Sequence, residues 1–220
     1  MPQVQQSVFI GSQASELLTA QFGVSTQDIH DVVRRIYAGF SVVTSLHPKG
    51  FSGTNAWAQG TSSMRELFIP MGWQPDDPSG QPRVVSRSRR VAITVSSGDP
   101  HTGDPHHDPQ TRNDKGAQTS NSVSFNSRQG QLFEVVTATD RRAAQASDAF
   151  ALWIFLYYID LDSGEVRFEL SKPSDMSDAN KVVGWSARMI FPPLNFRSSF
   201  ESDDEADGMP DIDIDVVPKM

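Results

Sequence analysis

The chain of 220 residues contains no cysteine, so it can form neither a disulfide bond nor a zinc site with thiolate ligands. It also lacks a long apolar run: the richest stretch, residues 150–159, is about half of the roughly 20 residues that span a membrane as a helix. Residues 1–6 show no basic segment followed by an apolar one, the pattern of an export signal. These absences predict a protein of the cytoplasm, most simply of a bacterium, with no membrane contact.

The charged residues are unevenly distributed along a chain whose net charge is −8. Residues 1–82 carry a net charge of −2, residues 83–142 carry +3, and residues 143–220 carry −9. A basic middle attracts phosphate-bearing ligands, and an acidic end can meet a partner or shield the basic surface. Ordinary solvated surface is the alternative interpretation of both segments.

The first third of the chain predicts helices. Ser12 is placed to begin a helix that Gly23 ends, and Ser25 with Asp28 resembles a capping box. Apolar residues at helical spacing then continue to Phe40. Residues 51–60 are rich in glycine, serine and asparagine and predict a loop, followed by a short helix from about residue 62. The helical part is therefore expected over residues 10–72.

From residue 83 onward the pattern predicts strands. Residues 91–95 alternate as in a strand with one buried face, and residues 150–159 give the strongest strand signal. A hairpin through Gly164 leads to residues 165–170, and residues 181–191 form a third long strand. Weaker candidates are strands at 122–126 and 131–139 and a short helix at 140–146. The predicted fold is α+β, with N-terminal helices followed by a mainly antiparallel, possibly mixed sheet over residues 83–192.

We expect residues 1–200 to form one domain and residues 201–220 to be an acidic tail. Residues 211–216 alternate strictly between aspartate and an aliphatic side chain. This segment could therefore add to the sheet as an edge strand whose acidic face discourages further pairing.

A polar segment, residues 96–120, follows the first predicted strand and contains three of the five histidines. Imidazole and carboxylate groups bind divalent metals, so a metal is possible at these residues. The candidate ligands are His101, Asp104, His106 and Asp108, and Asp99 and Glu169 are candidate catalytic carboxylates. No recognised ligand spacing occurs among them, so a flexible surface loop remains the alternative.

The same segment can also bind an anion. Hydroxyl groups, unobstructed backbone N–H groups and basic side chains could together hold phosphate groups. The candidate ligand-binding residues are Ser96, Ser97, Gly98, Thr102, Arg87, Arg89, Arg90, Arg112, Lys115 and Arg128. The spacings of a Walker A loop and of a dinucleotide-binding loop are both missing.

Glu169 invites comparison with metal-dependent nucleases that place a lysine two residues after a glutamate. Here that position is Ser171, and Lys172 lies on the opposite side of the strand, so the pattern is incomplete. The alternative is a cross-strand charge arrangement of Glu169 with Arg167 and Arg188. Trp185 and Arg188 are also candidate anchors of a protein interface. Serine-based catalysis has no sequence support, because no Gly-x-Ser-x-Gly motif occurs.

Three functions remain open, and whether the protein is an enzyme stays undecided. The favoured one is a binding or accessory subunit of a cytoplasmic multi-protein assembly that contacts a phosphate-bearing ligand, such as nucleic acid, through residues 83–128. The second is a metal-dependent hydrolase or nuclease that uses the loop of residues 99–108. The third is a protein-interaction or virion scaffold protein.

Overall fold

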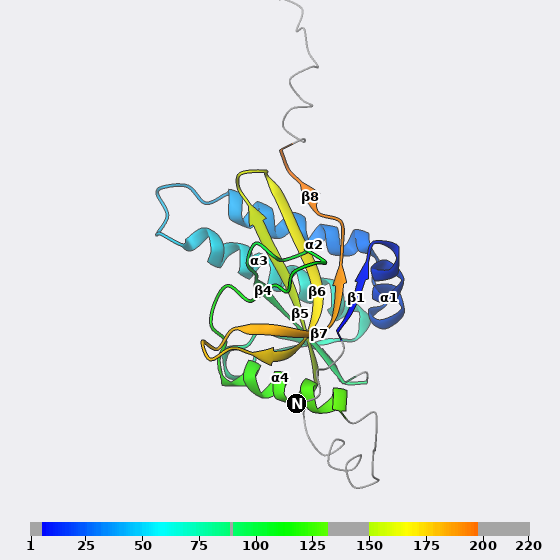
Figure 1. Ribbon diagram of the computed structural model, residues 1–220. Coiled ribbons are helices and arrows are strands. Elements are labelled where there is room, and N and C mark those ends of the chain that lie inside the picture. The colour runs from blue at the N-terminus through cyan, green and yellow to red at the C-terminus, as the bar shows by residue number, and fades with distance from the viewer. Residues whose placement is uncertain (1–5, 89, 132–149, 198–220) are drawn as a thin grey trace, which may run out of the picture.

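The computed structural model describes residues 6–88, 90–131 and 150–197 (Figure 1). The predicted strand at 131–139 lies outside these residues except for Gln131, which belongs to a helix, and the predicted helix at 140–146 and the acidic tail at 201–220 lie wholly outside them. No helix of the described residues is both long and apolar enough to cross a membrane.

The centre of the protein is an eight-stranded mixed sheet with the order β1-β7-β6-β5-β4-β3-β2, and β8 pairs with β6. The strands are β1 (Ser7–Ile10), β2 (Gln74–Asp76), β3 (Arg83–Ser86), β4 (Val91–Ser97), β5 (Ala151–Asp160), β6 (Glu165–Met176), β7 (Val182–Ile190) and β8 (Leu194–Asn195). Two neighbouring pairs, β1 with β7 and β4 with β5, are parallel, and the other pairs are antiparallel. The predicted α+β fold with a mainly antiparallel sheet is confirmed.

The two N-terminal helices form where the sequence predicts them. Helix α1 (Ser12–Phe22) ends at Gly23, whose φ of 76° lets its N–H reach the carbonyl of Thr19. Helix α2 (Thr26–Ser41) begins with the predicted capping box between Ser25 and Asp28. Local capping signals therefore set these helix ends.

The prediction of a loop at residues 51–60 is wrong, because these residues begin helix α3 (Phe51–Phe68). A glycine inside a helix costs about 1 kcal/mol relative to alanine, which is why the segment does not read as helical. Its packing against α2 explains two glycines, Gly60 of α3 and Gly39 of α2. A Cβ on Gly60 would lie 2.8 Å from Ile36 Cγ1, and one on Gly39 of α2 would lie 2.7 Å from Gln59 Cγ. Glycine lets the two helices approach closely, and the packing outweighs the low helical propensity.

The weaker prediction of a strand at residues 122–126 is also wrong, because this segment belongs to helix α4 (Ala117–Gln131). The inward side chains of α4 recur at helical spacing but are mostly polar: Thr119, Ser122 and Asn126 beside Val123. Asn126 donates to the carbonyls of Leu152 and Pro173 at 2.9 and 3.0 Å and accepts from the Leu152 N–H at 3.1 Å. Because the inner face is polar, the sequence of α4 has no hydrophobic periodicity that would predict a helix.

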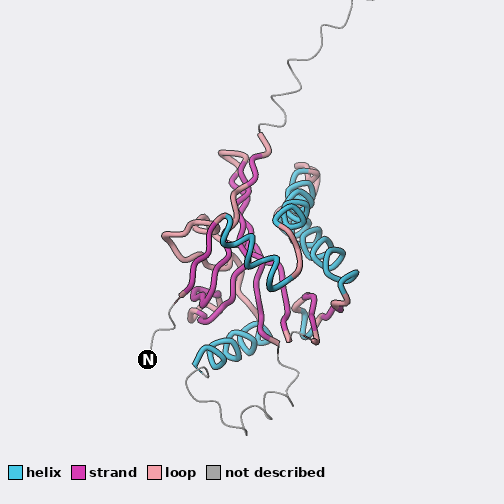
Figure 2. The backbone as a smooth tube through the Cα atoms, turned by 90° about the vertical axis from the view of Figure 1, so that its right-hand side faces the viewer, coloured by secondary structure: helices cyan, strands magenta, loops and turns pink. Residues whose placement is uncertain are grey.

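Both faces of the sheet are covered. One core joins α1, α2 and α3 to the face that carries Ile93, Phe155 and Phe168, and a smaller core on the other face joins Val123 of α4 to Leu152 and Leu156. Figure 2 shows the long helices on one side of the strands and α4 at their lower end. Strand β4 is consequently buried on both faces, which corrects the expectation of one buried face.

Candidate functional site

A cavity of about 750 Å³ opens where the parallel strands β4 and β5 end. Its wall is formed by these strand ends, the first turns of α3, residues 112–116 and the first turn of α4. Connections diverge at the carboxyl ends of parallel strands and commonly leave a crevice there. The volume falls within the range of small-molecule sites, roughly 300–1,000 Å³.

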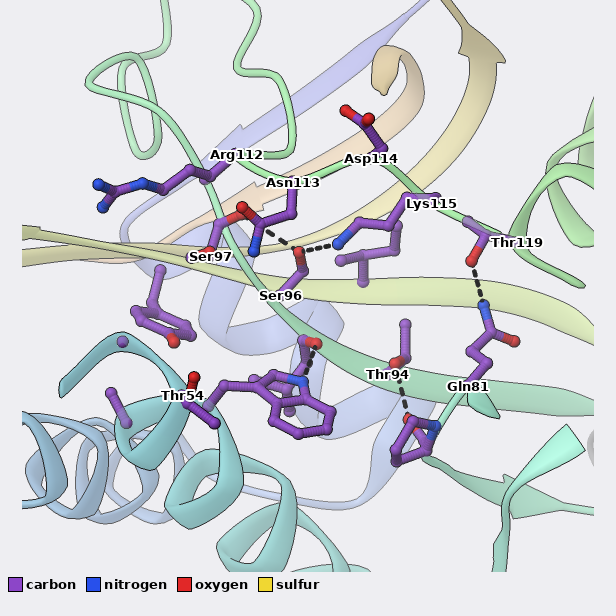
Figure 3. Close-up of a pocket in the computed structure, with 18 of the residues that line it drawn as sticks. Thr54, Gln81, Thr94, Ser96, Ser97, Arg112, Asn113, Asp114, Lys115 and Thr119 are labelled. Atoms are coloured by element: carbon purple, nitrogen blue, oxygen red, sulfur yellow. Dashed lines mark hydrogen bonds between the residues drawn. The ribbon is translucent and has the colours of Figure 1, made fainter. Parts of the chain in front are cut away.

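Lys115 is the charged group at the centre of this wall. Its Nζ donates a hydrogen bond of 2.7 Å to Ser96 Oγ at the end of β4. The backbone N–H of Lys115 donates to the Asn180 carbonyl at 2.8 Å, which fixes the chain at this point. Figure 3 shows Lys115 directed toward Ser96, whereas Asp114 points away. Burial lowers the pKa of Lys115 to about 8, and the nearby Asp114 opposes this shift.

The rest of the wall carries uncharged polar groups. Thr94 Oγ1 donates to the Pro82 carbonyl at 2.7 Å, and Gln81 Nε2 donates to Thr119 Oγ1 at 2.7 Å. The side-chain oxygen of Gln81 is buried without a partner among the described residues. The cavity wall therefore offers hydroxyl and amide groups to a ligand, whereas the Gln81 oxygen is enclosed by protein.

Aromatic side chains line the side of the cavity opposite Lys115. Trp57 of α3 donates its indole N–H to the Val95 carbonyl at 3.2 Å and leaves 36% of its surface exposed. Tyr157 of β5 is buried, and burial raises the pKa of its phenol, so it stays neutral at physiological pH. Arg112, which opposes that shift, is exposed at the rim (Figure 3). Planar ligands find stacking surfaces here.

The structure brings half of the predicted anion-binding residues together. Five of them line this cavity: Ser96, Ser97, Gly98, Arg112 and Lys115. Thr102 is instead fully buried, and its side chain lies against Gly98. A Cβ on Gly98 would lie 2.1 Å from Thr102 Oγ1. Arg87 donates to Gln74 at 3.0 Å beside β2, and Arg90 lies in the β3–β4 turn. Arg89 and the side chain of Arg128 lie outside the described residues.

The loop of residues 99–108 forms a second cluster. Ligand atoms of His101, Asp104 and His107 lie within 4.8 Å of one another, close enough for one metal ion. His107 Nδ1 lies 2.7 Å from Asp104 Oδ2, and the rings of His101 and His107 stack with centroids 5.0 Å apart. The backbone N–H of His106 and then the His107 side chain lower the pKa of Asp104. The group contains two of the predicted ligands, and His107 joins them where His106 was expected.

The other predicted ligands of this loop have hydrogen bonds that shape its turns. Asp99 Oδ1 accepts from the His101 N–H at 3.1 Å, and Asp108 Oδ1 accepts from Gln6 Nε2 at 2.7 Å. Neither aspartate belongs to the His101–Asp104–His107 group.

A buried ion pair fastens this loop to the sheet. Arg188 of β7 and Glu169 of β6 are 1% and 0% exposed, and their Nη2 and Oε2 atoms lie 2.6 Å apart. Arg188 also donates to the carbonyls of His107 and Asp104 at 2.9 and 3.0 Å. Glu169 accepts from the Gly103 N–H at 2.9 Å. The loop thus has a defined shape that depends on two side chains of the sheet.

This arrangement changes the interpretation of three predicted residues. Glu169 is enclosed by Arg188, Ser171 and Gly103, so it does not reach the histidine cluster. Trp185, predicted as an interface anchor together with Arg188, is buried and donates its indole N–H to the Pro109 carbonyl at 2.7 Å. Both anchor candidates hold the loop inside the chain instead of facing a partner. Arg167, which was expected to pair with Glu169, instead lies over the ring of Tyr158, with its Cζ 5.0 Å from the ring centroid.

Several cavity residues gave no functional signal in the sequence. Trp57 lies in a segment that predicted a loop, Tyr157 lies in a strand with many aromatic residues, and Gln81 and Thr119 lie in separate polar stretches. Only the meeting of α3, β5 and α4 makes them neighbours. Comparisons of the chain with known protein families, with characterised protein sequences and with solved structures found no match.

Proposed function

We propose that the protein is a binding protein for a phosphate-bearing ligand of the nucleotide class, held in the cavity at the ends of β4 and β5. The observation that carries this proposal is the half-buried ammonium of Lys115, which forms no ion pair with a carboxylate of the described residues. With a pKa of about 8, Lys115 is mostly protonated at pH 7. A partly buried cation without a counter-ion is costly, and an anionic ligand would relieve that cost.

The chemistry of the wall fits the two parts of such a ligand. The Ser96, Ser97 and Thr119 hydroxyls surround Lys115 and can donate to phosphate oxygens. Trp57 offers an exposed ring on which a base can stack, worth about 1–3 kcal/mol per base. A protein of this kind would serve as a binding subunit of a larger assembly.

A nucleotide and the phosphorylated end of a nucleic acid strand share this chemistry. Calorimetric titration with mononucleotides, with pyrophosphate and with short single strands that carry or lack a terminal phosphate separates the two sources. We expect saturable binding of a phosphate-bearing compound that weakens as salt is raised. Absence of binding by all of these compounds at millimolar concentration would remove the proposal.

The matched variants are Lys115→Gln and Lys172→Gln. Both lysines are half-buried, but Lys172 lines a different cavity, between β6, β7 and α1. Loss of a charge-assisted hydrogen bond worth about 1.5–3 kcal/mol predicts a 10- to 150-fold weaker affinity for Lys115→Gln. Lys172→Gln should bind as the unchanged protein does. Equal effects of the two variants would point away from this cavity.

The His101–Asp104–His107 group supports a second candidate function, the binding of a divalent metal ion. Two imidazoles and one carboxylate are a common ligand set for zinc, and three protein ligands leave a tetrahedral position for water. Such an open position is the arrangement of metal sites that activate water for hydrolysis. His101 and His107 are exposed, so an ion and a substrate could reach the group from solvent.

Titration with Co²⁺, followed by its visible absorption, and with Zn²⁺ by calorimetry tests this candidate on protein without a histidine tag. We expect one ion per chain and loss of binding in the pair His101→Ala and His107→Ala. His106→Ala is the control, because its side chain lies outside the group. Equal loss in the control and in the pair would show that the ions bind elsewhere.

A further inference from the structure

Ser96 and Lys115 form a hydrogen-bonded pair in the wall of the cavity, and ligand binding alone does not require this pairing. The two side chains are 2.7 Å apart and come from segments separated by 19 positions in the sequence. Ser96 is the penultimate residue of β4, so the strand fixes its backbone. Its hydroxyl donates to the Ser97 carbonyl at 3.2 Å, and the same hydrogen can turn toward Nζ once Lys115 is neutral. Both residues line the cavity.

We propose that Ser96 is a nucleophile, that Lys115 is its general base, and that the cavity hydrolyses a carboxylic ester. This inference rests on the proposed function only in requiring that a ligand enters the cavity. A serine hydroxyl is a weak nucleophile unless an adjacent base takes its proton, and a lysine freed of its charge can be that base. The geometry satisfies the first requirement, a nucleophile and a base within hydrogen-bond reach (Figure 3).

The reaction would proceed in two balanced steps. In the first, Ser96 Oγ bonds to the ester carbonyl carbon while its proton moves to the neutral Lys115 Nζ. The bond between that carbon and the alcohol oxygen breaks, and the alcohol leaves with the proton from Lys115. In the second, a water molecule attacks the acyl carbon, gives its proton to Lys115, and the acid leaves as Ser96 regains a proton. Asn113, which lines the cavity from the same loop as Lys115, offers an amide donor to the oxyanion.

The electrostatic surroundings permit Lys115 to lose its proton. The other ionisable groups that line the cavity are Arg112, Asp114, Tyr157 and Tyr158. Asp114 is exposed and directed away from the pair, and Tyr157 is kept neutral by burial (Figure 3). With its pKa lowered to about 8, roughly one tenth of Lys115 is neutral at pH 7. The fraction that can act as a base rises about fivefold, to roughly one half, at pH 8 and levels off above about pH 9.

The test uses a neutral alkyl fluorophosphonate, which phosphonylates activated serines with loss of fluoride, and peptide mass spectrometry of the full chain. We expect one modified residue, Ser96, and a labelling rate that rises with pH to a plateau with its midpoint near pH 8. Ser52→Ala is the matched control, because Ser52 lines the same cavity but is not the serine bonded to Lys115. It should be labelled at the unchanged rate. Modification of other serines without Ser96 would overturn the proposal.

Lys115→Arg separates this activity from ligand binding. Arginine keeps the positive charge but stays protonated in proteins, so it cannot act as a base. We expect labelling of Ser96 to fall by about 100-fold or more, as loss of a general base predicts, while phosphate-bearing ligands still bind. Circular dichroism confirms that the variant is folded. Undiminished labelling of folded Lys115→Arg would refute the role of Lys115 without affecting the binding proposal.

Discussion

The dependence of the histidine loop on Arg188 is the strongest stability prediction that the structure makes. Arg188→Met removes a guanidinium that is 1% exposed and leaves the carboxylate of Glu169, which is 0% exposed, without its partner. Breaking a buried ion pair from one side costs about 3–5 kcal/mol. The carbonyls of Asp104 and His107 lose their donor as well, which adds to the loss unless water reaches them. Domains are typically stable by about 5–15 kcal/mol, so this variant should be marginally folded.

The double variant Arg188→Met with Glu169→Gln tests the reasoning behind that magnitude. It removes the uncompensated charge, and glutamine can still accept from the Gly103 N–H through its oxygen and donate to the Ser171 hydroxyl through its amide nitrogen. Most of the electrostatic loss should therefore be regained, with about 1–3 kcal/mol remaining for the unanchored loop. Because the loop is no longer held, metal binding by His101 and its neighbours should stay weakened in the stable double variant.

Urea unfolding, followed by circular dichroism, measures these differences. If the slope of the free energy of unfolding against urea concentration stays constant, the shift of the midpoint concentration gives the change in stability. Arg34→Met is the reference, because its ion pair with Asp31 joins two exposed side chains and should contribute about 1 kcal/mol or less. If Arg188→Met lowered the free energy of unfolding no more than Arg34→Met, the ion pair would not fasten the loop. A double variant less stable than Arg188→Met alone would show that the charge is not the dominant loss.

Three further predictions concern the helices. Gly60→Ala should destabilise the protein by about 1–3 kcal/mol, because its Cβ would lie 2.8 Å from Ile36, whereas Gly53→Ala in the same helix meets nothing within 4 Å. Urea unfolding should show Gly53→Ala to be neutral or stabilising by up to about 1 kcal/mol, and equal losses would refute the close packing. Ser25→Ala removes the capping box of α2 and should cost about 1 kcal/mol in the same assay. Burial and then Arg34 lower the pKa of His30, so the folded state disfavours its protonation. Stability should be full above about pH 6.5 and fall as the pH drops toward 5, and thermal unfolding of His30→Phe should lack that part of the slope.

The candidate site was only partly predictable from the sequence. The signal at residues 96–115 was one of composition: hydroxyls, glycines and basic side chains gathered after a strand. Composition indicates which groups are near one another along the chain but not which way they point. The structure turns Lys115 toward Ser96 and leaves Asp114 facing away. It also selects His107 over His106 as the partner of Asp104. Side-chain direction in an irregular loop depends on its anchors, which here are distant residues.

Helix ends and turns whose residues lie close together in the sequence could be predicted from the sequence alone. The capping box at Ser25, the stop at Gly23 and the hairpin turn at Gly164 act within a few residues, and the apolar run of β5 can form only a buried strand or helix. Tertiary contacts decided the remainder. Helix α3 packs closely against α2 because Gly60 has no side chain, and helix α4 depends on Asn126 bonding to two strands. The burial of Arg188 with Glu169 and the approach of Lys115 to Ser96 likewise require partners that only the folded chain brings together. Polar and glycine-rich segments gain their stability from such distant partners, so their structure cannot be read from their own residues.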